Sequence, residues 1–198
     1  MSSDLGHIPS PLPNLNGPTI SLVPLSLGHV GDFLRYSSDP TLWTWWLREP
    51  PLDERTMRNE VRVALEQRAS RERIPFSLFH RERNEHIGST SYWHIDRQNH
   101  ALEIGSTWLA TPFHGSGINR EAKHLLLSHA FLEWKMTSVV LQTDELNQRS
   151  RRAIEKLGAK LERVIKDHRV TWSGRMRATA MYRISRDAWR ASQRTPSA

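Results

Sequence analysis

The sequence contains 198 residues, and its 37% apolar content with eight tryptophans is enough for the core of one globular domain. It contains no cysteine, which excludes disulfide bonds, thiolate zinc sites and a catalytic thiol. No apolar run reaches the length of a signal peptide or a membrane span. We therefore expect a cytoplasmic protein that has no membrane partner.

The net charge of +7 is concentrated near the C-terminus. The segment 145–177 holds ten Lys/Arg and four Asp/Glu, an excess of +6 (10 − 4). A basic face of this kind attracts a phosphorylated cofactor, RNA or an acidic partner, or is simply solvated. The charge alone does not choose among these partners.

The first half of the chain predicts an alternation of strands and helices. The expected elements are, in order, a strand over 19–26, helices over 27–38 and 53–70, and strands over 74–80, 85–95 and 100–110. Asp39-Pro40 ends the first helix, because a residue before proline disfavours the helical conformation, and Asp53 marks the start of the second. The turns between the last three strands are short and polar, which favours an antiparallel meander.

The second half continues this alternation. The expected elements are a helix over 118–134, a strand over 138–144, a helix over 147–158, strands over 161–172 and 176–184, and a short helix over 187–192. The first of these helices has a broad apolar surface, which implies that it packs against a sheet. Together the elements predict a mixed α/β domain over 18–192, between a disordered tail at 1–17 and a C-terminal tail at 193–198.

A glycine-containing turn, "HGSGIN", joins the strand over 100–110 to the helix that follows. Gly115 and Gly117 lack side chains, so the backbone N–H groups can curl around an anion while the helix offers its positive N-terminal end. The turn is not a P-loop, because no Gly-Lys-Ser/Thr follows, and it lacks the third glycine of a dinucleotide fingerprint. Two interpretations remain, a plain strand-to-helix turn and a cradle for the pyrophosphate of another cofactor.

Two segments of the second half carry a family resemblance. "LEIGSTWLATPFHGSGINREAKHLLLSHAF" followed by "VVLQTDELNQRSRRAIEKLGA" resembles the Gcn5-related N-acetyltransferase (GNAT) superfamily, and within it the branch of ribosomal-protein N-acetyltransferases. The resemblance covers 19–184 and is strongest over 102–159. It implies the acyl-CoA N-acyltransferase fold, a mixed and mostly antiparallel sheet with helices on both faces and a splayed strand pair.

The resemblance also implies a site for acetyl-coenzyme A, the co-substrate that lies between the splayed strands in this family. The backbone of 114–120 would bind its pyrophosphate, and Asn147 would touch the pantetheine arm as well as cap its own helix. The residues expected to contact the cofactor are Trp108, Leu109, His114, Gly115, Ser116, Gly117, Ile118, Asn119, Arg120 and Asn147.

The sequence departs from the family pattern at two positions. Pro112 stands where relatives often have Arg or Gln three residues before the first glycine, which leaves the cradle to backbone amides. Ile154 stands where many relatives have a tyrosine that protonates the departing thiolate, and the similar branch has a serine one turn earlier, at Ser150 here. Ser150 would then donate a proton or a hydrogen bond to the sulfur, or only hydrogen-bond its own helix.

Transfer of acetyl from a thioester to an amine needs a base for the amine and a polarised carbonyl. Since no cysteine is present, we expect direct attack by the amine in a ternary complex. Glu103, on the strand before the glycine turn, is the candidate base, because a carboxylate buried among apolar neighbours binds protons more strongly. The alternative is a structural glutamate that pairs with an arginine or caps a strand end.

The tryptophans indicate where an acceptor would bind. Trp43, Trp45 and Trp46 lie between the first two helices, where related enzymes place a flap over the acceptor, and they would be costly to expose. We expect Trp46, Trp93 and Trp108 to line a pocket for an apolar or planar group, although core packing would bury tryptophans equally well.

The predicted function is acetyl-CoA-dependent N-acetyl transfer to a primary amine, on a protein N-terminus or a small aminoacyl compound. The expected partner is a small-molecule or peptide amine, bound by a monomer or a homodimer without a metal ion, since no histidine spacing matches a zinc signature. One alternative is an enzyme that detoxifies an antibiotic or an aminoacyl nucleotide. The other is a non-catalytic RNA-binding or regulatory domain, for which nucleic acid is a less favoured partner.

Overall fold

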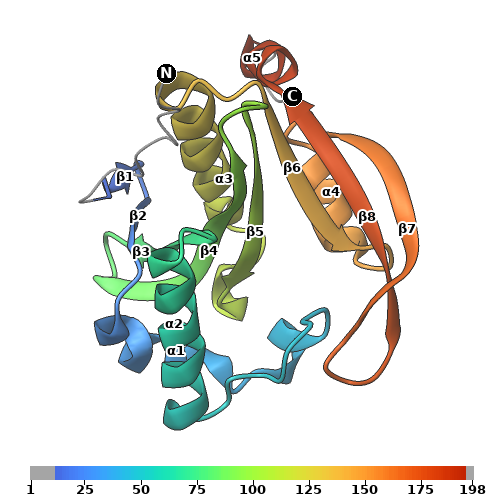
Figure 1. Ribbon diagram of the computed structural model, residues 1–198. Coiled ribbons are helices and arrows are strands. Elements are labelled where there is room, and N and C mark those ends of the chain that lie inside the picture. The colour runs from blue at the N-terminus through green and yellow to red at the C-terminus, as the bar shows by residue number, and fades with distance from the viewer. Residues whose placement is uncertain (1–11, 195–198) are drawn as a thin grey trace.

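The computed structural model describes residues 12–194, whose strands form one sheet in the order β1-β2-β3-β4-β5-β6-β8-β7 (Figure 1). The strands are β1 (Leu15–Asn16), β2 (Ile20–Pro24), β3 (Arg73–His80), β4 (Glu85–Asp96), β5 (Ala101–Leu109), β6 (Ser138–Asp144), β7 (Lys160–Val170) and β8 (Met176–Ser185). Neighbouring strands run antiparallel except for β5 and β6, which are parallel. The predicted mixed, mostly antiparallel α/β fold is confirmed.

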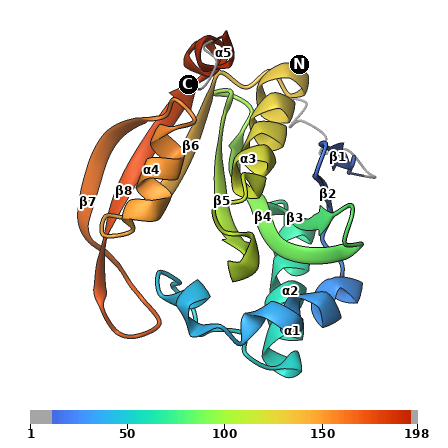
Figure 2. The same cartoon turned by 180° about the vertical axis from the view of Figure 1, so that it is seen from behind.

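Helices cover both faces of the sheet, as the two opposite views show (Figures 1 and 2). They are α1 (Val30–Ser37), α2 (Glu54–Ala69), α3 (Ile118–Ser128), α4 (Gln148–Glu155) and α5 (Arg186–Arg194). We call the face with α1 and α2 the front face and the face with α3 and α4 the back face. Within the described residues, no helix combines the length and the apolar content that crossing a bilayer requires.

The back face is fixed by apolar packing between β5 and α3. Leu102 and Ile104 of β5 belong to the same buried cluster as Leu126 of α3, and none of the three is more than 2% exposed. Burial of each such side chain contributes roughly 1.5–3 kcal/mol. This packing holds the N-terminus of α3, and with it the glycine turn, against the end of β5.

The sheet splits between β5 and β6. The two strands pair only from Ala101 with Ser138 to Ile104 with Leu141, although β5 continues to Leu109 and β6 to Asp144. Beyond these pairs the strands diverge (Figure 1). The predicted splayed strand pair is therefore present, and it leaves unpaired backbone on both sides of an opening.

A β-bulge lies on β5 beside the split. Ser89 and Ser91 of β4 pair with Trp108 and Gly105, so β5 carries one extra residue over this stretch. Ser106 takes up the extra length in the left-handed conformation, with φ 47°. Because paired residues share a face, the bulge keeps Gly105 and Trp108 together on the front face.

The N-terminal tail is shorter than the sequence predicts. Leu12 is buried, and β1 pairs with β2, so the expectation of disorder is wrong for residues 12–17. The Glu121 carboxylate of α3 accepts the N–H groups of Thr19 and Ile20 and anchors this edge of the sheet. Residues 1–11 of the expected tail lie outside the described residues.

At the C-terminus, α5 extends through Arg194, so residues 193 and 194 of the expected C-terminal tail are helical. Residues 195–198 lie outside the described residues. The helix expected over 118–134 is also divided, because α3 ends at Ser128 and continues as a π-helical turn over His129–Glu133.

Candidate active site

The glycine turn between β5 and α3 has an open concave backbone. Gly115 and Gly117 adopt left-handed conformations, with φ of 79° and 89°, and a Cβ added to either would meet nothing within 4 Å. Glycine is therefore required by the backbone conformation and not by crowding. Neither glycine N–H has an acceptor within the described residues, and α3 begins directly afterwards at Ile118. Open space, free N–H groups and a helix N-terminus suit a pyrophosphate.

His114 supports this loop from within. Its Nδ1 lies 2.8 Å from Nη1 of Arg149, and its Nε2 lies 2.8 Å from the Leu109 carbonyl oxygen. Because an arginine only donates and a carbonyl only accepts, the ring carries its hydrogen on Nε2. Burial, together with the Arg149 charge, lowers the pKa of His114, which keeps the ring neutral. The ring thus connects β5 with α4 across the split.

The other residues expected to contact the cofactor surround this loop. Ser116 Oγ donates 2.6 Å to the Phe113 carbonyl, so its hydroxyl closes the turn. The side chains of Trp108, Leu109 and Ile118 are buried, which leaves their backbone as the part available to a ligand. Asn119 and Arg120 follow in the first turn of α3.

The start of α4 lies at the end of β6, on the other side of the split. Asn147 caps the helix, because its Oδ1 accepts the Ser150 N–H at 3.0 Å. The Ser150 hydroxyl makes no hydrogen bond within residues 12–194, so the alternative that it bonds its own helix is not observed. The structure thus brings Asn147 and Ser150 together and leaves the hydroxyl available.

Glu103 lies on the front face, next to the last pair of residues that joins β5 to β6. Its side chain is 16% exposed. Its Oε2 accepts a hydrogen bond from Gln142 Nε2 at 2.9 Å, and His94 Nδ1 lies 3.2 Å from the same oxygen. Its cross-strand neighbour on β4 is Trp93. The contacts of the carboxylate are thus with an amide and an imidazole and not with an arginine.

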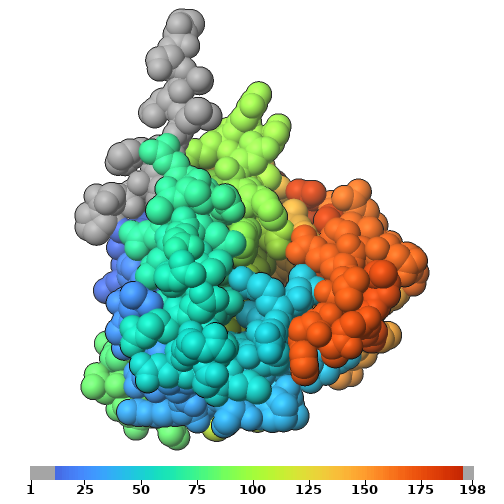
Figure 3. Space-filling model, turned by 60° about the horizontal axis from the view of Figure 1, so that its bottom comes forward, coloured from blue at the N-terminus to red at the C-terminus, as the bar shows by residue number. Residues whose placement is uncertain are grey.

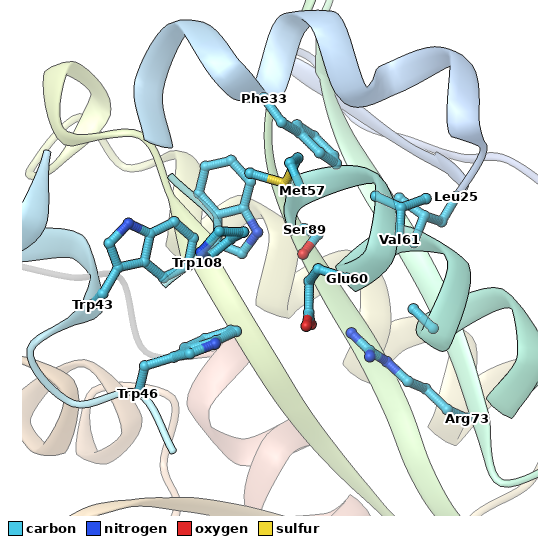
Figure 4. Close-up of a pocket in the computed structure, with 12 residues that line it drawn as sticks. Leu25, Phe33, Trp43, Trp46, Met57, Glu60, Val61, Arg73, Ser89 and Trp108 are labelled. Carbon is cyan, nitrogen blue, oxygen red and sulfur yellow. The ribbon is translucent and has the colours of Figure 1, made fainter. Parts of the chain in front are cut away.

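The tryptophans do not all gather in one pocket. Trp43, Trp46 and Trp108 line a cavity of about 20 Å³ on the front face (Figure 4), enough for about one water or a methyl group. Trp93 does not line this cavity. Its ring lies under the Arg73 guanidinium, with 5.0 Å from Cζ to the ring centroid. The structure therefore joins Trp46 to Trp108 and places Trp93 beside Glu103.

The cavity has a charged side as well as an aromatic one. Figure 4 shows Glu60 and Arg73 pointing toward the same space, opposite Trp46. Arg48 Nη2 donates to Glu60 Oε1 at 2.6 Å, and Arg73 Nε donates to Ser91 Oγ at 2.7 Å. Burial lowers the pKa of Arg73 to about 10, so the guanidinium stays charged at neutral pH. Sequence reasoning missed this group, because a lone arginine at the start of a strand gives no local signal.

Residues 40–52, which we call the flap, lie at the wide end of the split, below the diverging ends of β5 and β6 (Figure 1). In Figure 3 the flap, in cyan, lies between α2, in teal, and the β7–β8 hairpin, in orange. Trp172 at the hairpin tip donates its indole N–H to the Trp43 carbonyl at 2.8 Å. Arg175 stacks on Trp45, with 5.6 Å from Cζ to the ring centroid. The hairpin therefore holds the flap in place at this end of the split.

Comparison with known proteins identifies the family. A family model described as an acetyltransferase (GNAT) domain matches residues 19–160. The chain belongs to the GNAT acetyltransferase family. A candidate acetyltransferase from T. thermophilus is 30% identical to this GNAT protein, with a TM-score of 0.84 and 96% of each chain covered. No curated protein sequence matches.

More distant structures share the GNAT fold. A GCN5-related N-acetyltransferase from Brucella melitensis is 23% identical, with a TM-score of 0.84 over 91% of this chain and 82% of that chain. RimL, described as a ribosomal L7/L12 alpha-N-protein acetyltransferase, is 21% identical, with a TM-score of 0.76 over 87% of this chain and 94% of that chain. At these identities the likeness concerns the fold alone. Across residues 12–194, no three His, Asp or Glu side chains form a group that could hold a metal ion.

Proposed function

We propose that this GNAT acetyltransferase transfers acetyl from acetyl-coenzyme A to the nitrogen of a primary amine, on a protein N-terminus or a small aminoacyl compound. The observation that carries the proposal is the position of Glu103. Its carboxylate lies on the front face beside the split, and the glycine cradle lies at the end of the same strand, where the chain turns toward α3. The candidate base lies on β5, and the loop that would bind the pyrophosphate follows the end of the same strand.

The chain's own residues fit the cofactor. Bound acetyl-coenzyme A supplies an acetyl group activated as a thioester. The N–H groups of Gly115 and Gly117, with the first turn of α3, would hold its pyrophosphate, since their backbone is open and left-handed. Asn147 and Ser150 would face it from α4 across the split.

Glu103 would accept the proton that an amine loses on becoming an amide. The bond from Gln142 fixes Oε2, which leaves Oε1 for the amine. The chain has no cysteine that could carry the acetyl group, so the amine would attack the thioester directly. The Ser150 hydroxyl would donate a hydrogen bond to the departing sulfur.

The aromatic lining beside Trp46 favours a second class of acceptor. A planar or apolar amine, such as an antibiotic or an aminoacyl nucleotide, would stack on these rings. This class requires the flap to move, because the cavity at Trp46 holds only about one water-sized group.

The test is a panel of amines with acetyl-coenzyme A, read out as released free thiol. The panel contains peptide N-termini, polyamines and aminoacyl nucleotides, and Glu103→Gln serves as the control. We expect thiol release that depends on the amine, and a higher melting temperature with acetyl-coenzyme A. No release above the Glu103→Gln background and no thermal shift, together with salt-sensitive RNA binding, would instead support the non-catalytic alternative.

A further inference from the structure

The front face on the β6 and β8 side of the split carries a second polar cluster. Gln142, which holds Glu103, pairs with Met181, and Asp144 pairs with Thr179. Side chains two residues apart on a strand share a face. Asp144, Thr179 and Arg177 therefore point to the same face as Glu103, on the opposite side of the split.

Arg177 is a buried residue that makes no ion pair within residues 12–194. The residue is 8% exposed, and its Nε is buried with no hydrogen-bond partner within the described residues. The carboxylate of Asp144, which is fully buried, is ion-paired with Arg175 instead. A buried N–H donor that lacks a partner is costly, because its hydration is lost and no hydrogen bond replaces it.

Thr179 presents a second unsatisfied group beside it. Its Oγ1 is buried without a hydrogen-bond partner in the described part of the chain, and the residue is 0% exposed. A hydroxyl and a guanidinium two residues apart on one strand can both donate to one oxygen-bearing ligand group. Two neighbouring donors without partners form a candidate site for a ligand group, which would reach these buried atoms when the side chains that cover them move aside.

The surrounding charges indicate that this group is an anion. Burial is the main cause that lowers the pKa of Arg177, and the positive charges of Arg169 and Arg175 lower it further. The negative charges of Asp144 and Glu103 raise it. Since the charges of Asp144 and Arg175 compensate each other in their ion pair, the two positive charges of Arg169 and Arg177 face the single negative charge of Glu103. A carboxylate fits this excess of positive charge and accepts hydrogen bonds from both Arg177 and Thr179.

We propose that Arg177 and Thr179 bind a carboxylate on the amine acceptor, so that the preferred substrates are amines that also carry an acidic group. This inference rests on the proposed function. The acceptor's nitrogen would be drawn to Glu103 on β5 and its carboxylate to Arg177 on β8, which orients the acceptor across the split. Arg177 is then a specificity-determining residue, and the base remains Glu103.

The test uses peptides that are amidated at the C-terminus and differ only in one group, N-terminal Asp against Asn and Glu against Gln. The ratio of kcat/KM for acid over amide is measured for the unmodified protein, Arg177→Gln, Thr179→Val and Arg183→Gln. Arg183 is the matched control, because it lies on the same strand and face but is ion-paired with Glu162. Melting temperatures with and without acetyl-coenzyme A report folding and cofactor binding.

We expect the unmodified protein to prefer the acid of each pair by roughly ten- to a hundredfold, the usual range for a charge-assisted hydrogen bond. Arg177→Gln should bring this ratio close to one by raising the acceptor KM, and Thr179→Val should lower it several-fold. Arg183→Gln should leave it unchanged. If Arg177→Gln does not fold, Thr179→Val alone decides the matter.

Two results would overturn the inference. One is an equal or reversed preference in the unmodified protein, and the other is a preference for acids that survives in the Arg177→Gln and Thr179→Val variants. Both leave acetyl transfer intact and therefore differ from failure of the proposed function, in which no amine of either pair releases thiol.

Discussion

The back face and the front face of the sheet offer different kinds of polar groups at the split between β5 and β6. On the α3 side, one continuous loop offers backbone N–H groups, and its two left-handed glycines add no side chain. On the front face the polar groups are side chains from separate elements, with Glu103 on β5, Gln142 on β6 and Arg177 on β8. Backbone N–H groups do not depend on residue identity, so they suit a cofactor that is the same for every acceptor. Side-chain groups do depend on residue identity, so they suit recognition of one particular acceptor.

Glu103→Gln tests whether the front face supplies the general base, and it should have the largest effect on turnover. Loss of a general base typically lowers turnover by about 10²–10⁴-fold, so we expect kcat to fall by that factor while acetyl-coenzyme A affinity stays within about twofold. The measurements are steady-state thiol release and the thermal shift with acetyl-coenzyme A. Glu66→Gln, an exposed change of the same kind on α2, should have no effect. Equal activity of both variants would remove Glu103 from the mechanism.

Lys123 tests whether the back face tolerates a buried charge. Its Nζ lies 2.6 Å from Thr107 Oγ1 beside the β5 bulge, and burial lowers the pKa of Lys123 from 10.5 to about 7. Between pH 7 and 10.5 the unfolded chain binds this proton and the folded chain does not. The free energy of unfolding should therefore rise with pH in this window, by up to about 1.4 kcal/mol per pH unit.

Urea denaturation from about pH 7 to about pH 9 measures this slope. Lys123→Met removes the titrating group while keeping a long side chain, so its free energy of unfolding should depend less on pH and exceed that of the unmodified protein at about pH 7. Parallel pH dependences of the two proteins would show that Lys123 remains charged in the folded state.

The sequence could predict the features that depend on local signals, and it could not predict those that depend on three-dimensional contacts. Local signals were sufficient for α2, whose N-cap residue Asp53 forms a capping box, and for the turn at Gly115 and Gly117. They failed for β1, because two residues show no periodicity and are held by long-range contacts, namely pairing with β2 and packing of Leu15 against the core. The unsatisfied donors of Arg177 and Thr179 were also invisible, since a missing partner is a property of three-dimensional surroundings.

Gly117→Ala tests the cradle through its backbone alone. A left-handed residue with a Cβ costs about 1–2 kcal/mol, so distortion of the loop should weaken acetyl-coenzyme A binding by roughly tenfold. Calorimetric titration with the cofactor gives the change. Gly31→Ala on α1 is the matched control, because an added Cβ there also meets nothing within 4 Å and its φ is not left-handed. Equal affinities of the two variants would contradict the cradle.

Ser150→Ala should have the smallest effect of the four changes. The Asn147 cap uses the backbone N–H of Ser150, which alanine keeps, so the melting temperature should not change. Asn147→Ala is the contrast, since loss of a cap costs about 1 kcal/mol of stability. An unperturbed hydroxyl is a weak acid, and if Ser150 only orients the sulfur, kcat should fall several-fold. A loss of hundredfold or more in kcat would identify Ser150 as the proton donor to the departing sulfur. Catalysis would then depend on α4 as well as on Glu103 of the front face.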